Sequence, residues 1–172
     1  RPVPEIGTIS FRVIPEIQTQ VAEIMAGGID LSLDLTQEDA AALTGFPGID
    51  ISFGDTTRYF YISMDATGRS GETPLTDPVV RRAIAHAIDR EAIATRLVGG
   101  GATLIDAQCS PAQNLCPAGI PAYAYDPDRA RALLEEAGYN GEEIVFYVTE
   151  GGSGMLDPVA MGTAIQADLA AV

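Results

Sequence analysis

Few side chains in this sequence could carry out catalysis. The only histidine, His86, would have to supply the base for any serine or cysteine nucleophile and the imidazole of any histidine-containing metal site. Ser153 lies in Gly-Gly-Ser-Gly, without the strand and helix that surround the nucleophile of a hydrolase. We favour packing or a hydrogen bond at a helix flank for His86 and a turn for Ser153. The sequence therefore predicts no enzyme activity.

The two cysteines, Cys109 and Cys116, are separated by a stretch of prolines and small residues. Three interpretations are open: a short disulfide loop, half of a metal site, or two unrelated buried thiols. A zinc site would need further cysteine or histidine ligands nearby, and His86 is the only histidine in the chain. We therefore expect no bound metal and no cofactor.

Glycines and carboxylates also lack the patterns of known ligand sites. The glycines at 99–101 end a helical pattern and do not open one, which excludes a phosphate-binding loop or a dinucleotide fingerprint. Asp30 and Asp34 lack the spacing of a calcium-binding loop, and we expect both to be solvated. Glu135 and Glu136 are expected on the exposed side of a helix.

Length and charge narrow the class of protein. The chain has 172 residues, enough for one core or for parts of two lobes. With 24 acidic and ten basic residues, the net charge of −14 repels nucleic acid and anionic lipid. No apolar run approaches the roughly 20 residues that span a bilayer, and the opening residues RPVPEIGT show no signal-peptide pattern. We expect no nucleic-acid partner and no insertion into a membrane.

The strongest structural signal lies in residues 74–101. Asp77 can cap a helix that has Pro78 in its first turn. Apolar residues then recur at helical spacing: Val80, Ala83, Ile84, Ala87 and Ile88. A second apolar run follows the charged step at 89–91 and ends at glycines. This stretch predicts a bent helical hairpin.

Alternating helix and strand patterns on both sides of this hairpin indicate an α/β fold. Strands are predicted at 9–13, 29–35, 49–53, 58–64 and 144–148. Helices are predicted at 18–25, 37–43, 127–137 and 158–171. The order over residues 1–53 is therefore β-α-β-α-β.

The segment LTDPVVRRAIAHAIDREAI, residues 75–93, resembles a signature of the periplasmic dipeptide- and oligopeptide-binding proteins. These are the extracytoplasmic solute receptors of ABC importers, known as extracellular solute-binding protein family 5. Further segments resemble motifs of the same family and occur in its order: ISFRVIPE (9–16), AGGIDL (26–31), RYFYISMD (58–65) and YDPDRARALLEEAGY (125–139). Five motifs in the order of the family argue against a chance resemblance.

The resemblance implies a fold and a division of the chain. The expected structure is a fragment of the two-lobed, type II periplasmic-binding-protein fold of the peptide-receptor class, with mixed sheets flanked by helices. Residues 1–57 would form the end of the first lobe. Residues 58–172 would form the opening half of the second lobe. The chain would be the middle part of a longer receptor.

The resemblance also suggests which residues meet a ligand. In the family, the chain crosses from one lobe to the other near residue 57, beneath the ligand cleft. Thr57, Arg58, Tyr59 and Tyr61 are therefore the candidate ligand-binding residues. The alternative is that the inward-facing tyrosine belongs to the core and that Arg58 lies on the surface. Because the family's compartment is oxidising, the resemblance favours a disulfide between Cys109 and Cys116.

The implied function is binding without chemistry. The protein would be the solute-binding component of an ABC importer, located in the periplasm or otherwise outside the cytoplasm. It would capture short peptides or a similar small solute between its lobes and deliver the solute to the membrane permease. An alternative is a stand-alone α/β sensory or interaction domain derived from the same module.

Overall fold

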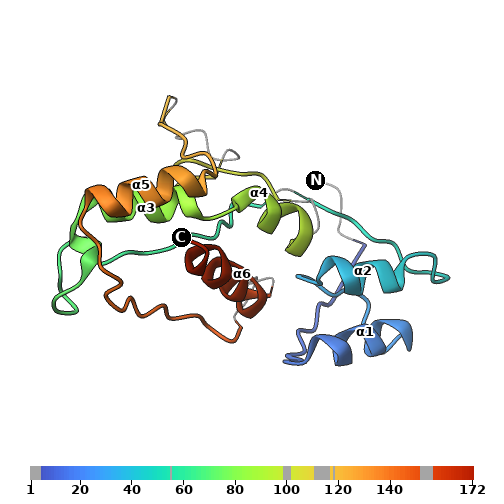
Figure 1. The fold of residues 1–172 in the computed structure, drawn as a ribbon. Coiled ribbons are helices and arrows are strands. Elements are labelled where there is room, and N and C mark those ends of the chain that lie inside the picture. Colours follow the sequence, from blue (N-terminus) through green and yellow to red (C-terminus); the bar gives the residue numbers. More distant parts are fainter. Residues whose placement is uncertain (1–4, 55, 99–101, 111–116, 118, 152–156) are drawn as a thin grey trace. The chain divides into compact units, whose positions relative to one another are not determined.

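The structure is a computed structural model, shown in Figure 1. It describes residues 5–54, 56–98, 102–110, 117, 119–151 and 157–172. The chain divides into two compact units, Arg1–Ser52 and Phe53–Val172, which we describe separately. The predicted boundary between lobes, after residue 57, lies within the second unit. The assignment of residues to receptor lobes stays a prediction.

The first unit contains two helices, α1 (Ile17–Met25) and α2 (Gln37–Leu43), which pack against each other. Asp39 links them, because its buried carboxylate accepts a hydrogen bond from Nε2 of Gln18 at 2.8 Å. Thr36 caps α2 by accepting from the backbone N–H of Asp39 at 3.1 Å, and its hydroxyl donates to the same carboxylate. A short polar network thus joins the two helices.

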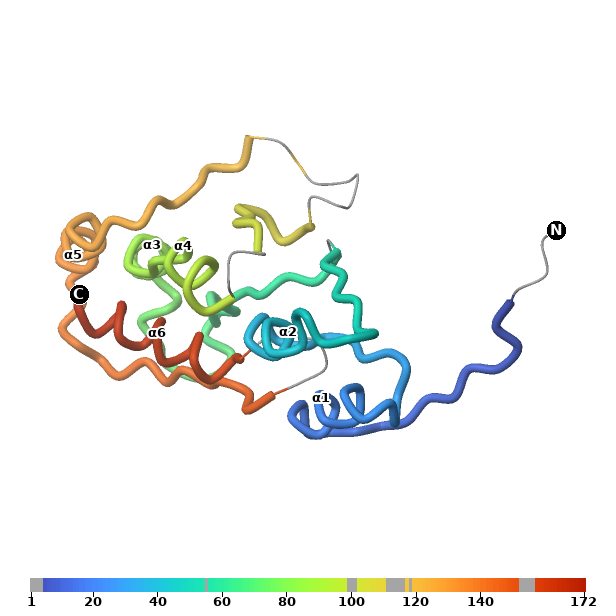
Figure 2. Tube along the Cα trace, turned by 90° about the vertical axis from the view of Figure 1, so that its right-hand side faces the viewer, coloured from blue at the N-terminus to red at the C-terminus, as the bar shows by residue number. Residues whose placement is uncertain are grey.

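The second unit is built around α3 (Pro78–Ala87) and α5 (Pro127–Glu136), which lie side by side in Figures 1 and 2. The other helices are η1 (Pro74–Thr76), α4 (Arg90–Ala92), η2 (Ile93–Leu97) and α6 (Pro158–Ala170). Val80, Ile84 and Ile88 form the centre of the core. Partly buried apolar residues surround them: Ile62, Met64, Leu75, Ile93, Leu134, Ala137, Ile144, Ile165 and Leu169. The two predicted helical runs and the bend between them are confirmed, as α3 and as α4 with η2, but the two runs do not pack against each other as the arms of a hairpin would.

Helices α3, α5 and α6 begin in the same way, with an aspartate cap followed by a proline. The side chain of Asp77 accepts from the N–H of Val79 at 2.7 Å. Asp126 accepts from the N–H of Arg129 at 2.8 Å, and Asp157 accepts from that of Ala160 at 3.1 Å. Each carboxylate satisfies an N–H group that has no partner inside the helix. These helix starts follow from local sequence.

The close approach of α6 to the extended segment 144–148 depends on Gly162. A methyl group added at this buried glycine would lie 2.6 Å from Cγ2 of Val148. Only a residue without a side chain fits there, since carbon atoms do not approach one another this closely.

Within the described ranges, no helix is both long and apolar enough to cross a bilayer.

The predicted strands are not formed in the part of the chain that the structure describes. This applies to 9–13, 29–35, 49–53, 58–64 and 144–148, so the mixed sheets of the predicted α/β fold are not confirmed. Phe11 and Val13 remain 94% and 91% exposed. An alternating pattern tells which side chains favour burial, but a strand also needs a neighbour for its backbone N–H and C=O groups. No such neighbour pairs with these segments in the described residues.

Candidate functional site

The candidate ligand-binding residues lie on one short extended segment at the start of the second unit. Thr57, Arg58 and Tyr61 are exposed, and Tyr59 is half-buried. The rings of Tyr59 and Tyr61 are 5.9 Å apart between centroids and tilted by 46°. Side chains two residues apart on extended backbone share a face, which is why these rings meet. Tyr61 is 65% exposed and therefore does not belong to the core.

Thr56 fixes the entry into this segment. Its Oγ1 accepts a hydrogen bond from the backbone N–H of Arg58 at 3.2 Å. Its carbonyl oxygen accepts another from Oγ of Ser110, also at 3.2 Å. The first bond is a local turn of the kind that threonine forms with a residue two positions later. The second reaches across 54 residues of sequence.

His86 holds the segment that leads into α5. Nδ1 of His86 lies 2.8 Å from the carbonyl oxygen of Ala124, a geometry in which a protonated Nδ1 donates. The imidazole meets the ring of Tyr123 edge-on, with centroids 5.4 Å apart. The backbone N–H of Asp126 donates to the carbonyl of His86 at 2.8 Å. This is the packing and hydrogen-bonding role that the sequence favoured.

Arg90 anchors a long loop at both of its ends. Nη1 donates to the carbonyl of Ile105 at 3.1 Å, and Nη2 donates to Oδ1 of Asp106 at 2.9 Å. Nη2 also reaches the carbonyl of Tyr123 at 3.2 Å. Sequence reasoning treated this arginine as part of a charged step and missed its role. Its two backbone-carbonyl acceptors lie 15 and 33 residues away, and any residue can supply a carbonyl.

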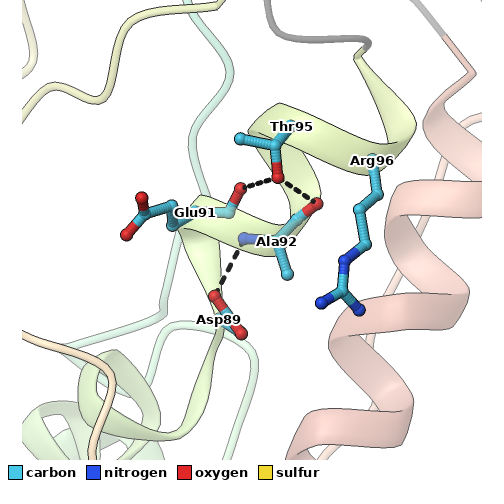
Figure 3. A pocket seen from close by; sticks show the side chains of 5 residues that line it. All are labelled: Asp89, Glu91, Ala92, Thr95 and Arg96. Atoms are coloured by element: carbon cyan, nitrogen blue, oxygen red, sulfur yellow. Dashed lines mark hydrogen bonds between the residues drawn. The ribbon is translucent and has the colours of Figure 1, made fainter.

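The junction of α3 and α4 borders an open hollow, shown in Figure 3. The hollow is lined by Asp89, Glu91, Ala92, Thr95 and Arg96. The N–H of Asp89 donates to Oδ2 of Asp168 on α6 at 2.9 Å, which ties the bend to that helix. Arg96 reaches alongside α6 in Figure 3. The Asp89 carboxylate accepts from the N–H of Ala92 at 2.9 Å and so caps α4.

No group of three or more histidine, cysteine, aspartate or glutamate side chains within the described residues could hold a metal ion.

The sequence matches the family described as bacterial extracellular solute-binding proteins, family 5 Middle, over residues 2–172. The chain belongs to this family. Membership implies the two-lobed, type II fold that the resemblance suggested.

Curated relatives of this family member are binding proteins by name. The glutathione-binding protein GsiB of Salmonella typhimurium (strain LT2) is 31% identical over 144 residues, which cover 80% of this chain and 26% of the relative. The proteins of the same name from Escherichia coli O1:K1 and Shigella boydii serotype 4 are 32% identical over the same length and with the same coverage. The chain therefore spans about a quarter of the length of these relatives.

The remaining candidates from the sequence have different outcomes in this family member. Asp30 and Asp34 are exposed, as predicted. Cys116 and Ser153 lie outside the described residues. The disulfide between Cys109 and Cys116 therefore stays a prediction, and so does the turn at Ser153. Glu135 and Glu136 lie on the exposed side of α5, also as predicted.

Asp65 organises the turn that precedes η1 and α3. Its carboxylate accepts hydrogen bonds from the hydroxyl and N–H of Ser70, at 2.7 and 2.6 Å. It also accepts from the N–H and hydroxyl of Thr67, at 3.2 and 3.3 Å. These bonds, led by the hydroxyl of Ser70, hold the pKa of the Asp65 carboxyl far below its usual range, because they favour the charged form. The charge shapes a turn and points to no catalytic role.

Proposed function

We propose that the chain is part of the solute-binding component of an ABC importer. The component captures short peptides or a similar small solute between two lobes and delivers the solute to the permease subunits in the membrane. Family membership over residues 2–172 is the observation that carries this proposal. The names of the relatives support it further, because glutathione is itself a small peptide. The component performs no reaction and works outside the cytoplasmic membrane, in the periplasm.

Thr57, Arg58, Tyr59 and Tyr61 form the ligand-contacting segment in this proposal. The tilted pair of tyrosine rings offers an aromatic wall, which suits the apolar parts of a peptide. Arg58 can offer a planar guanidinium to a peptide carboxylate, and charge-assisted bonds of this kind are the stronger ones. Residues 1–57 then belong to the first lobe and residues 58–172 to the second. The segment lies where the chain passes between them.

The predicted disulfide fits the same setting. The periplasm is oxidising, and disulfides persist there. A bridge between Cys109 and Cys116 would close a short loop, which the chain-entropy account values at about 2 to 3 kcal/mol. Mass spectrometry of the unreduced full-length protein would show the two cysteines in one cross-linked peptide. Free thiols at both positions in protein purified from the periplasm would contradict the pairing.

Calorimetry on the full-length protein tests the ligand-contacting segment. Reduced glutathione and tri-alanine serve as probes. Because Tyr61→Ala removes half of the aromatic wall and Arg58→Ala removes the guanidinium, we expect each to weaken binding of the better probe by about tenfold or more.

Tyr147→Ala is the matched control for this experiment. It removes another exposed tyrosine, which is 88% accessible and lies outside the segment. Affinities within twofold of the unmodified protein for both Tyr61→Ala and Arg58→Ala would rule out the assigned site. Failure of the protein to bind either probe, with the permease genes absent from its genetic neighbourhood, would count against the transport role itself.

A further inference from the structure

Ser110 is one of the few polar residues buried in the described part of the chain, with 4% of its surface exposed. Its hydroxyl donates to the carbonyl oxygen of Thr56 at 3.2 Å. A buried hydroxyl without a partner is costly, so this bond favours one placement of the chain at Thr56. Both residues belong to the second unit, Phe53–Val172.

Thr56 is held on two sides. The carbonyl is fixed by Ser110, while Oγ1 accepts from the N–H of Arg58. The two bonds act on the peptide groups at either side of Thr57, where the chain turns into the segment 57–61. They restrict the backbone that carries Arg58 and the tyrosine pair. The bond from Ser110 is the one that comes from a distant part of the sequence.

The loop that carries Ser110 is itself anchored. Arg90 binds the carbonyl of Ile105 and the carboxylate of Asp106, a few residues before Ser110. A continuous series of contacts thus runs from Arg90 through the loop to Ser110 and on to Thr56. The contacts of Arg90 with Ile105 and Asp106 therefore restrict the position of the backbone shortly before Ser110.

We propose that Ser110 is a positioning residue for the segment 57–61. It acts through the carbonyl of Thr56 and makes no contact with ligand. The consequence for ligand affinity rests on the proposed function, in which this segment binds the solute. The inference about backbone placement does not depend on the identity of the solute.

Hydrogen–deuterium exchange on the full-length protein, read by mass spectrometry, tests the placement directly. In Ser110→Ala we expect about fivefold faster exchange in peptides that cover 56–61, the size expected when one hydrogen bond is lost. Peptides from α3 and α5 should exchange as in the unmodified protein, and the melting temperature should stay unchanged. A general loss of stability would instead accelerate exchange in all of these peptides.

Ser32→Ala is the matched control, because it removes a hydroxyl that donates to Oε1 of Gln20 at 2.9 Å in the other unit. It should leave exchange at 56–61 unaltered. If Ser110→Ala does not fold, Arg90→Lys keeps the charge but loses the forked contacts of the loop anchor, and it should accelerate the same peptides. Unchanged exchange at 56–61 in the folded variant would overturn the proposal.

Binding of reduced glutathione and tri-alanine to the same variants separates the two proposals. Faster exchange together with about fivefold weaker binding supports both. Faster exchange with unchanged binding supports the placement by Ser110, and it contradicts the assignment of 57–61 to the ligand site.

Discussion

Helices α3 and α5 and the extended segments 9–13 and 144–148 satisfy their backbones in different ways. The helices make their own hydrogen bonds, begin at aspartate caps and bury Ala83 and Leu133 almost completely. The extended segments are also rich in apolar residues, yet Phe11 and Tyr147 stay exposed. Local sequence is sufficient for a helix, whereas a strand is defined by its neighbour. The difference teaches that the helices of this chain can be predicted from neighbouring residues in the sequence, whereas strand pairing cannot.

Leu133→Ala should have the largest effect on stability. Leu133 on α5 is 2% exposed, so the substitution removes packed methyl groups and leaves a cavity. We expect the free energy of unfolding to fall by about 2 to 5 kcal/mol in chemical denaturation of the 172-residue chain. Leu31→Ala, at a leucine that is 74% exposed, should change it by less than about 0.5 kcal/mol. An equal decrease in the free energy of unfolding for both variants would contradict the difference in packing between the helices and the extended segments.

Gly162→Ala probes a place where the extended segment 144–148 lies close against helix α6. The added methyl group would meet Val148, so we expect a loss of about 1 to 3 kcal/mol despite the better helix propensity of alanine. The double variant Gly162→Ala/Val148→Ala should recover most of this loss, because the smaller side chain removes the clash. Thermal denaturation of the single and double variants measures the coupling. Additive effects would show that the two residues do not touch.

Asp77→Ala should cost about 1 kcal/mol, since it leaves the N–H of Val79 without its capping partner. Asp128→Ala is the matched control. Its carboxylate pairs with Arg131 on the surface of α5, and such exposed pairs contribute little. Circular dichroism during urea unfolding would compare the two. A larger loss for Asp128→Ala would show that surface charge outweighs capping in starting these helices.

Asp65→Asn should have the smallest effect on stability, and the size of this effect should depend on pH. Its pKa is lower in the folded chain than the value of about 3.9 expected after unfolding. The stabilisation is therefore complete above that value and is lost as the pH falls below about 4. The melting temperature of Asp65→Asn should lie below that of the unmodified chain at pH 7 and converge with it at acidic pH. Ser70→Ala should show a weaker form of the same trend, and a gap independent of pH would contradict this account.

The sequence predicts different parts of the molecule unequally. Asp77-Pro78 and Asp126-Pro127 identify helix starts, because a cap and its helix are neighbours in sequence. The bonds from Arg90 to Ile105 and Tyr123 and the bond from Ser110 to Thr56 could not be predicted, since they end on backbone carbonyls, which every residue type supplies.

Strand pairing fails for a related reason. The pattern at 9–13 shows which side chains alternate, but the identity and register of a partner strand are not encoded within those residues. The candidate ligand segment was found by family likeness, and neither composition nor spacing alone would have singled it out. Its backbone restraints come from Thr56 and Ser110, whose hydrogen bonds no sequence pattern indicates.

The repeated start of α3, α5 and α6 has a consequence for handling the protein. The peptide bond between aspartate and proline is the most acid-labile bond in ordinary polypeptides, because the carboxyl group assists departure of the basic proline nitrogen. Warm dilute acid should therefore cut this chain immediately before each of these helices, at Asp77, Asp126 and Asp157. Of the four resulting fragments, the last three would start with a proline and would carry the intact sequences of α3, α5 and α6, respectively.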